Sequence, residues 1–194
     1  MKVSAIYGII PIVLFALLIS CQPRKSSGAP LFTDSLNSDP QCYLNGNLSA
    51  EDRRKKFPFQ AVPEIRIVSF VKNYEQLPFD KDSLLRTALF TDNIVLQQEQ
   101  IDSLTNVLFN YNYSPQTQLF SKVELGCYEP RHAIVFLTKD KKVKYYLELC
   151  FECNGYRSNL PDSTWGSFCE GKYELIKKSF AFAGVSYFGP GDPK

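Results

Sequence analysis

AIVFLTKDKKVKYYLELC, residues 133–150, is the stretch that decides the fold of this chain. Its two ends are apolar segments rich in β-branched and aromatic residues, and residues 138–142 between them are polar. Two such segments joined by a short polar turn are typical of a β-hairpin. The sequence therefore predicts two antiparallel strands over residues 132–150.

A turn centred on Asp140 and Lys141 fixes the register of this hairpin, because it places residues whose numbers add up to 281 opposite each other. One face then carries His132, Ile134, Phe136, Tyr145, Leu147 and Leu149. The other face carries Arg131, Ala133, Val135, Leu137, Tyr146, Glu148 and Cys150. Arg131 and Glu148 are near-diagonal neighbours on that second face, so we expect them to form a structural ion pair.

Two amphipathic helices are predicted around the hairpin. Residues 98–110 form the first, and its apolar positions share one face: Ile101, Leu104, Leu108 and Tyr111. Ser167 and Glu170 have the spacing of a capping box that starts the second. Its buried stripe follows at intervals of four and three residues: Cys169, Tyr173, Ile176, Phe180 and Ala183. Gly184 suits its end.

These elements indicate an α+β fold. A further strand is expected at Glu64–Val71, and a short helix within Ser83–Leu89. The predicted architecture is a small antiparallel sheet with the hairpin 132–150 at its centre and the helices packed on one face.

The N-terminus has the pattern of a secretory signal: Lys2 precedes a short apolar run that ends at Ile19. That run is shorter than the roughly 20 apolar residues that a membrane span needs. The run ends in Leu18-Ile19-Ser20-Cys21, which resembles the lipobox of bacterial lipoproteins and implies lipidation of Cys21. The other interpretation is an ordinary cleaved signal peptide in which Cys21 is incidental.

The lipobox resemblance implies a membrane-bound protein of the cell envelope. Lipoproteins of this kind carry two or three acyl chains, palmitate among them, and more than one chain makes attachment stable. The residue after Cys21 is not aspartate, which favours the outer membrane with the domain facing the periplasm. We expect a signal peptide over residues 1–20, a lipidated cysteine and flexible tether over 21–60, and one α+β domain over 61–190.

Charge excludes one class of partner. Without Lys2 the chain has 21 basic and 20 acidic side chains. A nearly neutral domain lacks the basic surface that nucleic-acid binding requires. The basic run Arg53 to Lys56 is interpreted as a solvated loop. The expected partners are therefore the membrane, through the lipid, and an envelope component that the sequence does not identify.

The cysteines and the single histidine form the predicted chemical centre. The hairpin register should bring Cys127 close to Cys150 and Cys153. Cys169 opens a helix that should pack on the same sheet, so four thiols could meet. His132, on the opposite face from Cys150, is expected to be a hydrogen-bonded structural residue.

A resemblance strengthens this choice of residues. The segment CYEPRHAI, residues 127–134, followed by LCFEC, residues 149–153, resembles the shared core of a widespread group of uncharacterised bacterial proteins, many of which look like lipoproteins. No activity is attached to that group. The resemblance therefore implies which residues matter and gives no reaction.

Three chemistries fit these residues. In an oxidising compartment the cysteines would form one or two disulfides, with Cys42 or another cysteine left over. The sequence leaves the connectivity open, and a bond from Cys127 to Cys150 or Cys153 is one possibility. A thiolate zinc site would use Cys127, Cys150 and Cys153 with Cys169 or His132. Thiol redox chemistry would use the Cys150–Cys153 pair. We expect the first: a non-enzymatic binding or structural module without a cofactor, stapled by disulfides, with zinc or thiol redox as the alternative.

Overall fold

The computed structural model describes residues 42–71, 77–113, 128–169 and 171–189. The predictions made for Cys21, Cys127, Glu170 and the segment 1–41 lie outside the described residues.

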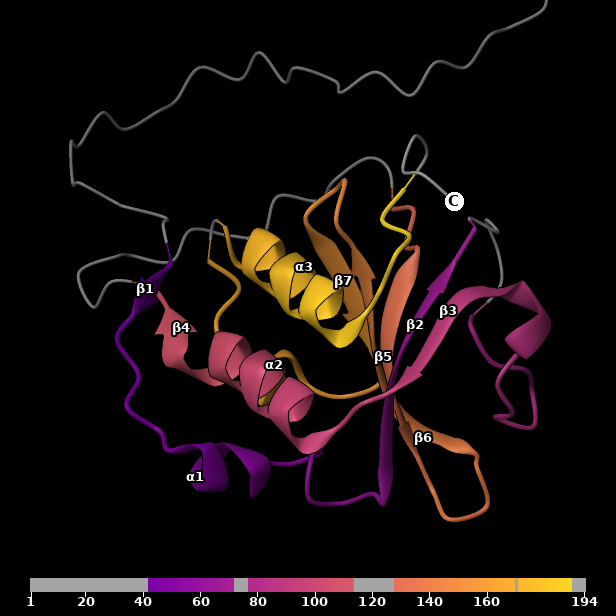
Figure 1. Ribbon diagram of the computed structural model, residues 1–194, viewed down its shortest axis with the longest axis horizontal. Coiled ribbons are helices and arrows are strands. Elements are labelled where there is room, and N and C mark those ends of the chain that lie inside the picture. Colours follow the sequence, from indigo (N-terminus) through magenta and orange to yellow (C-terminus); the bar gives the residue numbers. More distant parts are fainter. Residues whose placement is uncertain (1–41, 72–76, 114–127, 170, 190–194) are drawn as a thin grey trace, which may run out of the picture.

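Most described strands belong to one five-stranded antiparallel sheet. Its strands are β2 Glu64–Phe70, β3 Phe90–Val95, β5 His132–Leu137, β6 Val143–Cys150 and β7 Gly155–Ser158. Their order across the sheet is β3-β2-β5-β6-β7 (Figure 1). A separate two-stranded ribbon pairs β1 Tyr43–Leu44 with β4 Tyr111–Asn112. The predicted hairpin is therefore β5 and β6, and β5 is the middle strand.

The register of the hairpin is the predicted one. Phe136 lies opposite Tyr145, and His132 lies opposite Leu149. An irregularity after Phe136 then shifts the pairing, so Leu137 meets Val143. Lys141 in the turn has a φ of 61°, a left-handed conformation that an irregular turn can use.

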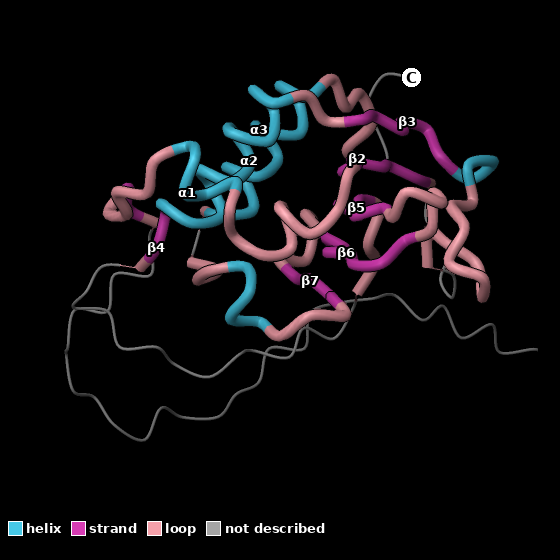
Figure 2. Tube along the Cα trace, turned by 90° about the horizontal axis from the view of Figure 1, so that it is seen from below, coloured by secondary structure: helices cyan, strands magenta, loops and turns pink. Residues whose placement is uncertain are grey.

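Helices cover one face of the sheet. The covering helices are α2 Gln98–Asn110 and α3 Lys172–Ala183, and α1 Ala50–Arg54 packs against α2. Short 3-10 helices lie at Thr87–Leu89, in the connection between β2 and β3, and at Asp162–Trp165. Figure 2 shows α2 and α3 together on one side of the row of strands. The predicted α+β class, with its central hairpin and one helical face, is confirmed. Among the described helices, none has the length and apolar character needed to cross a bilayer.

Each face of the sheet has its own apolar core, because side chains alternate along a strand. The helix-side core includes Ile134, Phe136, Leu147 and Leu149 from the hairpin, together with the buried stripe of α3. The opposite core is smaller, and its buried residues are Val68, Phe70, Ala133, Val135, Leu137 and Val143. The hairpin faces predicted from the sequence are therefore confirmed.

The segment between β2 and β3 covers the second core. Phe79, Leu85 and Phe90 pack against it, and a single β-bridge joins Phe79 to Leu85. The predicted helix over Ser83–Leu89 is wrong except for one 3-10 turn at its end. Phe79 and Leu85 lie on an irregular segment and Phe90 lies at the start of β3, and all three side chains cover this face of the sheet.

The start of α3 also differs from the prediction. The helix begins at Lys172 after Gly171, which has a φ of 85°, so Ser167 is not its N-cap. Residues 166–169 have no regular secondary structure, and Cys169 at the end of this connection is bonded to Cys42. The buried stripe from Cys169 to Ala183 is nevertheless confirmed, because a connection can continue the apolar face of a helix before the helix begins.

The folded chain also begins earlier than residue 61, the boundary expected from the sequence. Cys42 is bonded to Cys169, α1 follows, and Phe59 is buried in the helix-side core. The basic run is not wholly solvated either, because Arg53 is buried and donates to the carbonyl of Leu48 at 2.6 Å. Residues 42–60 therefore belong to the domain and not to a tether.

Candidate functional site

The sheet register brings one end of the hairpin and the β6–β7 connection together. Cys150 is the last residue of β6, where it pairs with Gly155 of β7. Between them the chain makes a turn through Phe151, Glu152 and Cys153. Cys150 and Cys153 form a disulfide within this turn. Cys150 is 1 % exposed, whereas Cys153 is half-buried.

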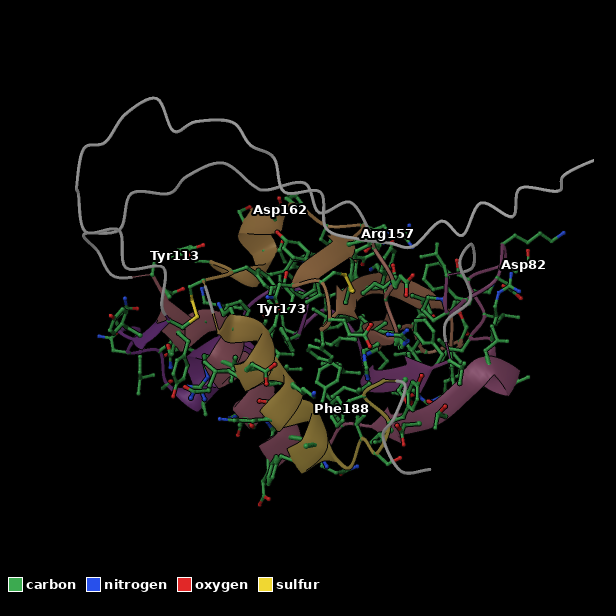
Figure 3. All side chains as sticks on the ribbon, turned by 90° about the horizontal axis from the view of Figure 1, so that it is seen from above. Asp82, Tyr113, Arg157, Asp162, Tyr173 and Phe188 are labelled. Atoms are coloured by element: carbon green, nitrogen blue, oxygen red, sulfur yellow. A yellow bond between two sulfur atoms is a disulfide. The ribbon has the colours of Figure 1, made fainter. Side chains whose placement is uncertain are left out.

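The predicted convergence of four thiols does not occur. Cys169 is bonded to Cys42, and Figure 3 shows the two sulfur–sulfur bonds at separate places in the domain. Of the connectivities that the sequence left open, the bonds from Cys150 or Cys153 to Cys127 are not formed, because Cys150 and Cys153 are bonded to each other. Cys42, which was expected to lie in a tether, is instead the partner of Cys169.

These bonds also bear on the zinc hypothesis. Thiolate, not a disulfide sulfur, is the form of cysteine that binds zinc. Cys150, Cys153 and Cys169 are all oxidised. Within the described residues no group of three or more potential ligands could hold a metal ion. The proposed thiolate set is therefore not assembled in this structure.

His132 is a buried structural residue, as expected. Its Nε2 lies 2.7 Å from the carbonyl oxygen of Tyr187, and the rings of Phe151, Phe180 and Phe188 lie around it. Burial lowers its pKa from 6.5 to about 4, so the ring is neutral at pH 7. Its Nδ1 has no hydrogen-bond partner in the described part of the chain.

The predicted ion pair between Arg131 and Glu148 is wrong, because each pairs elsewhere. Arg131 Nη1 lies 2.5 Å from Glu152 in the disulfide turn. Glu148 Oε2 lies 2.7 Å from Arg157 Nη2, and these two residues are directly opposite in β6 and β7. A directly opposite residue on a neighbouring strand is closer than a diagonal one. The prediction lacked β7 and therefore lacked the closer partner.

Glu148 is an unusual carboxyl group because its side chain has no exposed surface. Burial raises its pKa, although the neighbouring Arg157 opposes the shift. The guanidinium of Arg157 also lies 5.6 Å from the centre of the Tyr128 ring. Oε1 of Glu148 has no hydrogen-bond partner among the described residues. Loss of Arg157 would therefore leave a buried carboxylate without its cation, which is costly.

Lys172 is a buried charged residue for which the sequence analysis made no prediction. Its Nζ donates to the carbonyl oxygens of Leu108 at 2.8 Å and Ser167 at 2.5 Å. Burial lowers its pKa from 10.5 to about 7. The one feature of the sequence that could have indicated burial of Lys172 is its position four residues before Ile176, beside the apolar stripe of α3. Lysine is so seldom buried that this signal is weak.

A groove lies beside the C-terminal end of α2 and the 3-10 helix Asp162–Trp165. Its volume is about 360 Å³. It is lined by Leu48, Lys56, Phe57, Phe109, Ser163, Thr164 and Gly166. None of these residues belongs to the predicted cysteine and histidine centre. The groove was not predicted, because its walls come from the segments around Phe57 and Ser163 and from the end of α2, which are far apart in the chain.

Gly166 shapes one wall of this groove. Its φ of 71° is left-handed, and a Cβ added there would lie 2.4 Å from the carbonyl oxygen of Leu108. That carbonyl is also the acceptor of Lys172. Only glycine combines this conformation with such a close approach. Lys172 therefore holds the carbonyl of Leu108 against which Gly166 packs, and so supports this wall of the groove.

Aromatic rings and one cation give the groove its chemistry. Phe57 is 42 % exposed, and Lys56 Nζ lies 5.5 Å from the centre of the Phe109 ring. The neighbouring bases are occupied: Arg54 pairs with Asp102 and Lys55 with Glu51. Lys56 forms no ion pair with any described residue.

Comparison of the chain with protein-family models, with curated proteins and with solved structures found no match, so the resemblance of residues 127–153 stays a prediction.

Proposed function

We propose that this protein is a lipid-anchored component of the bacterial cell envelope whose domain is a non-enzymatic binding module. The groove between Lys56, Phe109 and Ser163 would be its binding site. The observation that carries the binding proposal is this groove, because it combines exposed aromatic surface, a cation that pairs with no carboxylate among the described residues, and two hydroxyl groups. The ligand that this lining favours is anionic and carries an aromatic or other apolar group.

The size of the groove supports a small ligand or one side chain of a larger partner. About 360 Å³ is at the lower end of the range for ligand pockets, roughly 300–1,000 Å³. Phe59, beneath Phe109, makes edge-on ring contacts with both Phe109 and Phe136. The apolar wall thus continues into the core and would need little rearrangement on binding.

The oxidised cysteines support location outside the cytoplasm. Four of the described cysteines form two disulfides, and disulfides persist mainly in oxidising compartments. This agrees with export directed by residues 1–20 and attachment through lipid on Cys21. Our proposed location is the outer membrane, with the domain in the periplasm.

A fluorescent anion tests the binding site. Anilinonaphthalene sulfonate carries both an aromatic system and a sulfonate, and its emission rises in apolar surroundings. We expect saturable binding to the native full-length protein, and severalfold weaker binding in Phe57→Ala and in Lys56→Gln. Phe182→Ala is the matched control, because Phe182 is 59 % exposed on α3 and lies outside the groove. Equal losses in Phe57→Ala and Phe182→Ala would exclude the groove as the site.

Lipidation requires a separate test. Cells that express the full chain are grown with labelled palmitate and then fractionated. We expect label and membrane association in the wild type and in Cys153→Ser, and neither in Cys21→Ser. A Cys21→Ser protein that still carries the label would refute the anchor and leave the groove proposal untouched.

A further inference from the structure

We propose that the Cys150–Cys153 disulfide is a thiol–disulfide exchange site, whereas the Cys42–Cys169 disulfide is purely structural. The two bonds differ in what they join. Cys42 and Cys169 are 127 positions apart in sequence, while Cys150 and Cys153 are three apart. This activity goes beyond ligand binding and does not depend on the groove.

The fold does not need the local bond in order to close the β6–β7 connection. Cys150 and Gly155 already pair in the ladder, and pairing continues to Leu147 and Ser158. A cross-link that closes a loop of three positions removes little freedom from the unfolded chain, and in the folded chain the ladder keeps β6 and β7 together without it. Reduction can therefore occur in the folded protein, which is the property that a reversible exchange site needs.

The turn gives a nucleophile access to one sulfur. Cys153 is half-buried and lies between Glu152 and Asn154, both exposed. Cys150 is almost fully buried at the end of β6. An incoming thiolate would therefore attack Cys153, and Cys150 would be the sulfur that leaves.

A cation lies against the same turn. Arg131 is only 8 % exposed at its side chain and is held by Glu152 at 2.5 Å and Glu129 at 3.5 Å. Glu152 lies directly before Cys153 in this turn. Arg131 is thus a positioning residue, because its contact with Glu152 holds the turn that carries the disulfide.

The reaction balances with a dithiol partner. One partner thiolate attacks Sγ of Cys153, the bond to Cys150 breaks, and a mixed disulfide forms. The second partner thiolate then attacks the partner's own sulfur in that mixed disulfide and releases Cys153. The partner loses two electrons and two protons and becomes a disulfide, while Cys150 and Cys153 become thiols.

A redox titration tests the proposal. The purified full-length chain is equilibrated with graded ratios of reduced to oxidised glutathione, quenched with acid and alkylated, and the cysteine peptides are identified by mass. We expect the Cys150–Cys153 pair to follow a two-electron curve while Cys42–Cys169 stays oxidised and the circular dichroism spectrum is unchanged. Adding an excess of oxidised glutathione should restore the bond. Reduction of both pairs together with loss of structure would overturn the proposal, as would a Cys150–Cys153 pair that resists thiols until denaturant is added.

Two variants sharpen the result. Arg131→Gln releases Glu152 from this contact, and it should change the rate of reduction of the Cys150–Cys153 pair severalfold and shift the midpoint of its titration. Arg66→Gln is the matched control, because Arg66 also pairs with a glutamate, Glu64, at 2.7 Å but lies on β2. Equal rates in the two variants would show that Arg131 has no role in the exchange.

Discussion

The two disulfides should make very different contributions to stability, and this difference can be measured directly. In the chain-entropy model a cross-link between residues 127 positions apart stabilises the fold by about 5 kcal/mol. A link across three positions contributes about 2 kcal/mol. We therefore expect Cys42→Ala/Cys169→Ala to lose about 3 kcal/mol more in the free energy of unfolding than Cys150→Ala/Cys153→Ala.

The two double variants are well matched. Each removes one almost fully buried cysteine, Cys169 or Cys150, and one half-buried cysteine. The cost of the cavities that these changes leave should therefore largely cancel in the comparison. What remains is the difference in loop length.

The assay is urea unfolding followed by tryptophan fluorescence. Trp165 is the only tryptophan in the chain, is fully buried, and donates from Nε1 to the Ser158 hydroxyl at 3.1 Å. Because whole domains are stable by only about 5–15 kcal/mol, loss of the long-range bond should move the midpoint far toward zero urea. Equal losses in the two variants, or a larger loss for the Cys150 and Cys153 pair, would refute the reasoning.

Three further predictions concern buried ionisable groups. Because burial lowers the pKa of His132 from 6.5 to about 4, the stability that this residue supports is full above pH 6.5 and falls as the pH drops toward 4. The fall is about 3 kcal/mol, and it should be missing from the urea stability of His132→Phe compared at pH 7 and pH 4. The lowered pKa of Lys172, about 7, gives stability that rises with pH between 7 and 10.5. Lys172→Met should therefore lose about 3 kcal/mol of the wild-type gain between pH 7 and pH 10, and parallel curves would contradict this. Arg157→Met leaves Glu148 buried without its cation and should cost about 3 kcal/mol at pH 7. Adding Glu148→Gln should recover most of that loss, and a double variant no more stable than Arg157→Met alone would argue against the pair.

Local patterns in the sequence were sufficient for much of the fold. The hairpin register followed from the turn at Asp140 and Lys141, and the extent of α2 followed from a helical period of apolar residues. The stripe of α3 was also correct. These features depend on residues within about 20 positions of one another, where periodicity reports directly on burial.

Long-range and edge features were not accessible in this way. β7 is only four residues long, and the side chains of β3 alternate between half-buried and exposed at the sheet edge, so neither has a strong apolar signal. Because β7 was not predicted, Arg131 was the only expected partner for the carboxylate of Glu148, whereas the actual partner is Arg157 on β7. The bond between Cys42 and Cys169 likewise leaves no spacing signal, because cysteine connectivity cannot be deduced from sequence alone.

Long-range ties fix the C-terminal part of the domain at several points. Cys169 is bonded to Cys42 before α3, Lys172 reaches the carbonyl of Leu108 at its start, and His132 contacts the carbonyl of Tyr187 after its end. All of these ties are buried or covalent, so α3 is held against the sheet and α2 as one rigid unit.

Both proposed sites, by contrast, lie on connections at the margins of that unit. The groove is formed by the segments around Phe57 and Ser163 with the end of α2, and the exchange disulfide lies in the turn between β6 and β7. Functional residues on loops that a rigid scaffold positions are the common arrangement in proteins. The cysteines therefore divide into two classes by location: Cys42 and Cys169 hold the scaffold together, whereas Cys150 and Cys153 lie where bond breakage leaves the scaffold intact. The redox titration and the unfolding experiment measure this division independently, and the proposal requires both to assign the same pair to the scaffold.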